Sequence, residues 1–115
     1  MAQKKEKTAE KKALTHDVTM PLLHAMFEEF KELAKKKPEA AVSKSKLVIA
    51  NRLLNRVREV LADEESIEFL DLLNEDDVPQ VSDVTLIFSQ YVAAMRAFKT
   101  KYHGWNGAEH AWFIK

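Results

Sequence analysis

The sequence of 115 residues has no cysteine, two glycines, three prolines and no long apolar run. The lack of cysteine excludes a disulfide framework, a cysteine-ligated zinc finger and a thiol nucleophile, and it suits a reducing compartment. Two glycines and three prolines are too few for the many turns of an all-β fold. A membrane-spanning helix needs a run of about 18 apolar residues, and a secretory signal needs an apolar N-terminal segment; neither occurs. We therefore expect a soluble cytoplasmic protein that does not enter a membrane.

Charge is balanced overall but divided along the chain. The formal net charge is zero, yet residues 1–58 carry 14 Lys or Arg and 7 Asp or Glu, whereas residues 59–115 carry 4 and 11. Ten of these carboxylates lie between Glu59 and Asp83, a segment without Lys or Arg. Two interpretations stay open: the basic and acidic parts pair inside the fold, or they meet a partner with a matching charge distribution.

The stretch from Ser82 to His103 predicts a long, largely buried helix. At about 100° per residue its large apolar side chains fall on one stripe. That stripe consists of Val84, Ile87, Phe88, Tyr91, Met95, Phe98 and Tyr102. Ser82 is the expected N-cap of this helix, and Gly104 is the expected left-handed residue that closes it.

Two more amphipathic helices precede it. The first is expected to start at Thr19, with Pro21 in its first turn, and to end near Lys36 before Pro38. The second covers about 43–62, and its leucines and valines face one way. A short helix is expected within the acidic segment, with Ile67, Leu70 and Leu73 facing inward. The predicted fold is all-α, a small antiparallel bundle of three longer helices and one short helix.

The two ends of the chain differ in composition. Residues 1–15 contain almost no large apolar side chain and many lysines, which predicts a flexible tail before a single helical domain over residues 16–115. The C-terminal residues include Trp105, Trp112 and Phe113, which are too apolar for a free end. We expect the two tryptophans to be at least partly buried against the first or last long helix, with a turn at Asn106–Gly107.

No pattern for catalysis or for a cofactor occurs in the sequence. The four histidines lack the spacing of a zinc or di-iron site, and the serines lack a nucleophile-elbow context. The calcium-loop pattern is missing around Glu75–Asp77, and no glycine-rich phosphate loop is present. We expect a protein that is not an enzyme and has no catalytic residue, cofactor or metal.

The remaining hypotheses concern binding. The leading one is a helical interaction module or accessory subunit that binds another protein or a second copy of itself. The expected contact residues are Leu86, Ala93 and Ala97, on the far side of the long helix, with Trp105, Trp112 and Phe113 of the tail. The alternative is nucleic-acid binding, because Arg and Asn side chains on one helix face can read base edges. The residues for that alternative are Lys44, Asn51, Arg52, Asn55, Arg56 and Arg58, helped by the lysine-rich tail.

Overall fold

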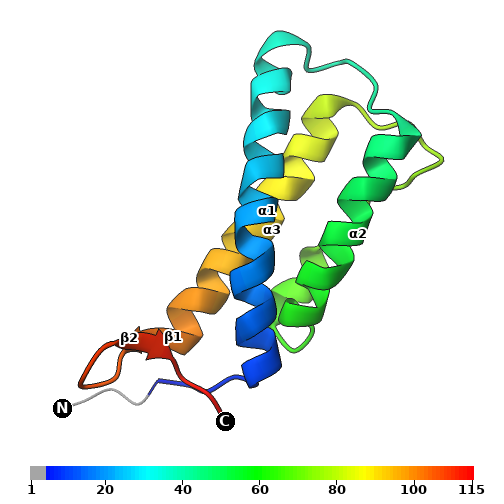
Figure 1. Cartoon of the computed structure of the whole chain (residues 1–115). Helices are drawn as coiled ribbons and strands as arrows, with labels where there is room; N and C mark the ends of the chain where they lie inside the picture. Colours follow the sequence, from blue (N-terminus) through cyan, green and yellow to red (C-terminus); the bar gives the residue numbers. More distant parts are fainter. Residues whose placement is uncertain (1–4) are drawn as a thin grey trace.

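The computed structural model describes residues 5–115 as an elongated helical molecule, about 51 × 24 × 21 Å (Figure 1). Its elements are α1 (Glu10–Lys36), α2 (Lys44–Leu61), a 3-10 helix η1 (Glu65–Phe69), α3 (Val81–Tyr102), β1 (His103–Trp105) and β2 (His110–Trp112). Helix α1 packs against both α2 and α3. Among the described residues, no helix is long and apolar enough to cross a membrane.

The helix order is antiparallel only in part. Helix α1 runs opposite to α2 and α3, whereas α2 and α3 run parallel to each other (Figure 1). The reason is the segment of residues 62–80, which carries the chain back along the whole bundle before α3 begins. The chain is mostly helical, but the all-α prediction is corrected by a small two-stranded sheet at its C-terminal end.

Helix α1 starts nine residues earlier than predicted, at Glu10 rather than after Thr19. Pro21 therefore lies inside the helix and removes one backbone hydrogen bond there. The Thr19 hydroxyl does not cap a helix end but donates to the carbonyl oxygen of Thr15 at 2.7 Å. Burial of Ala13 and His16 on the inner side of this added segment stabilises the extra turns.

The start of α1 at Glu10 also corrects the prediction of a flexible tail over residues 1–15. The backbone N–H of Thr8 donates to the Phe113 carbonyl oxygen at 2.9 Å, and the N–H of Lys115 donates to Thr8 at 3.0 Å. The predicted domain boundary at residue 16 falls within α1. Composition missed this order because it depends on distant partners: the backbone of the C-terminal residues pairs with Thr8, and the Lys12 side chain pairs with Asp63. Residues 1–4 of the predicted tail lie outside the described residues.

Helix α2 confirms its predicted bounds to within one residue, with Ser43 at the N-cap accepting from the Lys46 N–H. Helix α3 also has its predicted length, but Ser82 is not its cap. The N-cap is Gln80, whose backbone N–H donates to the Asp83 carboxylate at 3.2 Å in a reciprocal capping box. The long apolar stripe predicted for this helix is buried, apart from the half-buried Ile87.

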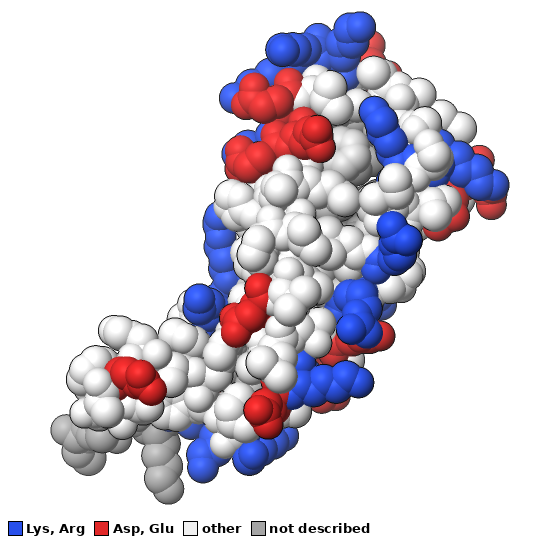
Figure 2. Space-filling model, viewed as in Figure 1, with Lys and Arg blue, Asp and Glu red and all other residues white. Residues whose placement is uncertain are grey.

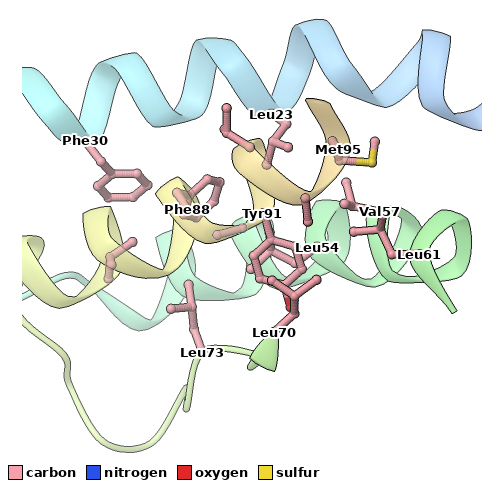
Figure 3. Packing of buried hydrophobic residues seen from close by; sticks show 14 of the residues in the cluster. Leu23, Phe30, Leu54, Val57, Leu61, Leu70, Leu73, Phe88, Tyr91 and Met95 are labelled. Atoms are coloured by element: carbon pink, nitrogen blue, oxygen red, sulfur yellow. The ribbon is translucent and has the colours of Figure 1, made fainter. Parts of the chain in front are cut away.

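The core lies where α1, α2, α3 and the return segment meet (Figure 3). Phe30 of α1 contacts Phe88 of α3 with ring centroids 5.5 Å apart, and Leu54 and Val57 of α2 are fully buried beneath them. Leu70 and Leu73 of the return segment close the cluster from the other side, as their spacing predicted. This arrangement leaves the seam between α1 and α2 without a cover on the side away from the return segment.

The C-terminal residues form a β-hairpin across the end of the bundle. Gly104 pairs with Ala111 in this hairpin, so the prediction that it closes α3 in a left-handed conformation is wrong. Helix α3 ends because His103 is already extended and begins β1. Gly107, with φ of 101°, forms the turn, and the side-chain Oδ1 of Asn106 accepts from the backbone N–H groups of Ala108 and Glu109 at 2.9 Å each.

Candidate partner-binding groove between α1 and α2

Three large aliphatic side chains of α1 point into solvent along one line. Leu14, Val18 and Leu22 are 58%, 67% and 56% exposed and are spaced four residues apart, which places them on one side of a helix. The core-facing residues of α1, among them His16 and Leu23, lie on the other side. Helix α1 is therefore apolar on two sides, and the structure buries only one of them.

A groove runs beside this strip, along the seam between α1 and α2. Its widest part has a volume of about 490 Å³ and is bounded by Val18 and Leu22 on α1 and by Ile49 and Leu53 on α2. A second hollow of about 210 Å³ continues it past Ile49 to Leu33. We call these two hollows, with Leu14 at the open end, the α1–α2 groove. Its floor is formed by half-buried Met26 and Leu53, and its exposed apolar walls are Val18, Leu22, Leu33 and Ile49.

Charged residues follow the α2 edge of the groove. Lys46, Arg52 and Arg56 line the two hollows, whereas Glu29 on α1 is the acidic residue that lines them. Figure 2 shows this face as an uncharged band, with blue Lys and Arg groups along the α2 side and red carboxylates near the upper end of α1. The groove is thus an apolar channel with one basic edge, a form that suits recognition of another chain.

The predicted contact residues on α3 do not belong to this groove. Leu86 is 62% exposed, and Ala93 and Ala97 are also exposed, so the far side of α3 is not the second buried side that was expected. The reason is that α1 and α2 both pack on the other sides of α3, and no element within residues 5–115 covers this one. Leu86 is the single large apolar residue of the three, which makes this surface a weaker candidate than the groove.

The tail residues have different environments. Trp112 is half-buried: its ring lies 5.0 Å from His16 and 5.9 Å from Phe98 between centroids, and its Nε1 donates to Asp17 at 3.1 Å. Phe113 is also half-buried. Trp105 is 60% exposed, which corrects its predicted burial, because it lies two strand residues, or about 6.6 Å, beyond His103 and past the helix ends. It contacts His110 across the hairpin instead.

The structure does not bring the six residues of the nucleic-acid hypothesis onto one surface. Asn51 is buried, donates to the Leu73 carbonyl oxygen at 2.7 Å and accepts from its N–H at 2.9 Å. Arg58 is half-buried and donates to the carbonyl oxygen of Leu70. Both side chains hold the acidic segment in place and are not available to a base.

The other four remain at the surface of α2. Lys44 pairs with Asp76 at 3.3 Å, and Arg56 pairs with Glu59 at 3.0 Å. Within residues 5–115, Arg52 and Asn55 have no side-chain hydrogen bond, and Arg52 borders the α1–α2 groove. Pairing between the basic and acidic halves of the chain thus occurs at Lys12–Asp63, Lys44–Asp76 and Arg56–Glu59. Arg58 meets the acidic segment through a carbonyl oxygen rather than a carboxylate.

A second cleft lies on the opposite side of α1, between α1 and α3, and His16, His24 and His103 are among the residues that line it. His16 is buried and its Nε2 donates to the Met95 carbonyl oxygen at 2.8 Å, which fixes the proton on that nitrogen. Burial lowers the pKa of His16 below its usual value, and the hydrogen bond to Met95 only partly opposes this effect. Burial, reinforced by the nearby Lys99, also lowers the pKa of His103.

Three polar side chains of this cleft, His16, His24 and Asp17, have partners within the fold. His24 lies 3.4 Å from an Arg96 nitrogen, and Asp17 is engaged by Trp112. Among the described residues, no three His, Asp or Glu side chains are placed to hold a metal ion. The neutral His16 ring serves as a core group, stacked at 5.7 Å on Phe98.

The groove residues were missed by the sequence interpretation, although a signal for them was present. Leu14, Val18 and Leu22 already show the spacing of one helix face, but assigning residues 1–15 to a tail separated Leu14 from the other two. Comparison with protein-family models, with curated proteins and with solved structures gave no match to this chain.

Proposed function

We propose that this protein is a small helical interaction module without catalytic activity of its own, and that it binds another protein through the α1–α2 groove. The observation that carries the proposal is the line of Leu14, Val18 and Leu22, each more than half exposed beside a concave apolar channel. Large aliphatic side chains grouped in this way are costly in water and mark interaction sites in soluble proteins. Single exposed leucines elsewhere carry no such argument.

The geometry of the groove supports a binding role better than a catalytic one. Its walls are aliphatic, and its charged groups stand at the rim, which is the distribution found in protein interfaces. Nucleic-acid binding has less support, because Asn51 and Arg58 are committed to the acidic segment. A duplex would also gain nothing from the aliphatic strip, since phosphate contacts supply most of its affinity.

The test is site-specific crosslinking in an extract of the native host. A photoreactive amino acid replaces Leu22 in one sample and Leu86 in the other, because these two leucines are similarly exposed, at 56% and 62%, on different faces. We expect Leu22 to yield a crosslinked protein that mass spectrometry identifies and that binds the purified chain directly. Leu22→Asp should abolish that binding, and Leu86→Asp should leave it unchanged.

Two results would overturn the proposal. Crosslinking from Leu86 but not from Leu22 would transfer the binding site to α3. Binding to DNA or RNA that falls steeply with salt and is lost in Arg52→Ala plus Arg56→Ala would establish the nucleic-acid alternative, because each neutralised phosphate contributes a slope of about −0.9 on duplex DNA.

A further inference from the structure

The shape of the groove restricts what can occupy it. Its apolar wall on α1 extends from Val18 to Leu33, which at 1.5 Å per residue is about 22 Å of helix. A channel of this length between two helices is the position that a fourth helix takes in a four-helix bundle. An added β-strand would instead need a free sheet edge, and the described sheet is the short hairpin at the end of the molecule.

The edge charges restrict the occupant further. Within residues 5–115, Lys46 and Arg52 have no carboxylate partner, although both line the groove. Arg56 is paired only with Glu59, three residues along the same helix, and both side chains are more than half exposed. An exposed pair of this kind contributes little to stability and can be exchanged for a partner at small cost. Three cations therefore face the space beside the apolar channel.

We infer that the groove binds an amphipathic α-helix of another protein, with aliphatic residues along one face and Asp or Glu residues along the edge that lies against α2. This inference rests on the proposed function and adds the chemistry of the partner. The aliphatic face covers Val18, Leu22 and Ile49, and the acidic edge meets Lys46, Arg52 and Arg56. A helix of about 15 residues matches the length of the channel.

A second copy of this chain fits the groove less well. In a two-fold dimer both molecules use the same surface, so the basic α2 edges of both copies lie in one interface. Such a dimer brings together six cations and four nearby carboxylates, Glu29 and Glu59 of each copy, so the cations are in excess. An acidic partner helix balances the three cations of one groove without this repulsion.

Two designed peptides of 18 residues provide the test. Both carry Leu or Ile at positions i, i+4, i+7 and i+11, and they differ only at the edge positions, which are Glu in one and Lys in the other. Fluorescence anisotropy with the full chain measures both affinities at low and high salt. We expect the Glu-edged peptide to bind at least about tenfold more tightly, and this preference to shrink as salt screens the charges.

Variants of the protein separate the charge effect from the apolar one. Arg52→Glu combined with Arg56→Glu should reverse the preference between the peptides, whereas Leu22→Asp should weaken both. Leu86→Asp is the matched control and should change neither. Circular dichroism of each variant checks that the helices remain intact, which their surface positions favour.

The outcomes distinguish this inference from the proposed function. Equal affinity for the two peptides, or tighter binding of the Lys-edged one, would overturn the acidic-helix inference while the crosslinking at Leu22 still stands. Concentration-dependent dimerisation in sedimentation experiments, lost in Leu22→Asp, would show that the groove belongs to a second copy and would also overturn it. Failure of Leu22 to crosslink any protein would overturn the proposed function, and this inference would fall with it.

Discussion

Helix α1 packs against α3 along one seam and against α2 along another, and the two seams differ in how far they are buried. Towards α3, its buried residues meet the aromatic residues of that helix, and the hairpin covers the lower end: His16 contacts Phe98 at 5.7 Å and Trp112 at 5.0 Å. Towards α2, the outer half of the seam is open, with Leu22 and Ile49 in contact with solvent. The same helix thus contributes a closed, aromatic seam that stabilises the fold and an open, aliphatic one that is available to a partner.

We expect the largest difference in unfolding free energy when a buried residue of the closed seam and an exposed residue of the open seam are each replaced by alanine. Phe98 is 1% exposed and contacts His16, Tyr102 and Trp112, so Phe98→Ala should lower the free energy of unfolding by about 3–5 kcal/mol. Leu22→Ala in the open seam should change it by less than about 0.5 kcal/mol. Urea denaturation measures both values, and a cost for Leu22→Ala close to that of Phe98→Ala would show that the groove is part of the core.

Replacing the hairpin tryptophan that covers the end of the closed seam should have the next largest effect on the free energy of unfolding. Trp112→Ala should lower the free energy of unfolding by about 2 kcal/mol, less than a fully buried tryptophan because the ring is half-buried. Trp105→Ala should cost under about 0.5 kcal/mol, since that ring faces solvent.

Fluorescence checks the same pair directly. The Trp105→Phe variant reports Trp112 alone and should emit at shorter wavelength than the Trp112→Phe variant, which reports Trp105. Identical emission from the two variants would contradict the assigned burial of Trp112.

Acid should weaken the closed seam in particular. Because the pKa of His16 is lowered in the fold, the unfolded chain binds the proton more readily. Stability from this group is complete above a pH of about 6.5, the ordinary histidine value, and is lost as the pH falls from there through the lower folded-state pKa. His103 acts with the same sign, while the charges of Asp17 and Lys99 act on His16 in opposite directions.

Melting temperature against pH is the measurement. The chain should melt at lower temperature as the pH is reduced from 7 to 5, and His16→Phe should flatten this dependence. A slope that survives in His16→Phe would assign the effect to another group.

The smallest effect on folding is expected in the open seam itself. Val18→Thr combined with Leu22→Gln removes aliphatic surface that is already in water, so the free energy of unfolding should stay within about 1 kcal/mol of the parent. The same double variant should lose the partner identified by crosslinking. Loss of stability together with binding would mean that these side chains support the α1–α2 contact.

Much of the helical pattern could be predicted because it depends on local spacing. The bounds of α2 and the stripe of α3 follow from apolar periodicity, and Ser43 caps its helix as its residue type favours. The start of α1 could not, since the cap signal at Thr19 and Pro21 is stronger locally than the contacts of Ala13 and His16 that extend the helix. The hairpin was missed because its three-residue strands are too short to show an alternating pattern.

The candidate site needed more than periodicity. The sequence by itself determined that α1 has aliphatic residues on two sides and that α2 is basic along its outer face, because side-chain direction follows from helical geometry. Only the tertiary structure decided which apolar side is buried: residues 62–80 return along the far side of α2 and α3, and Asn51 and Arg58 hold them there. Their hydrogen bonds and apolar side chains are used on that side, and no segment within residues 5–115 covers Leu14, Val18 and Leu22.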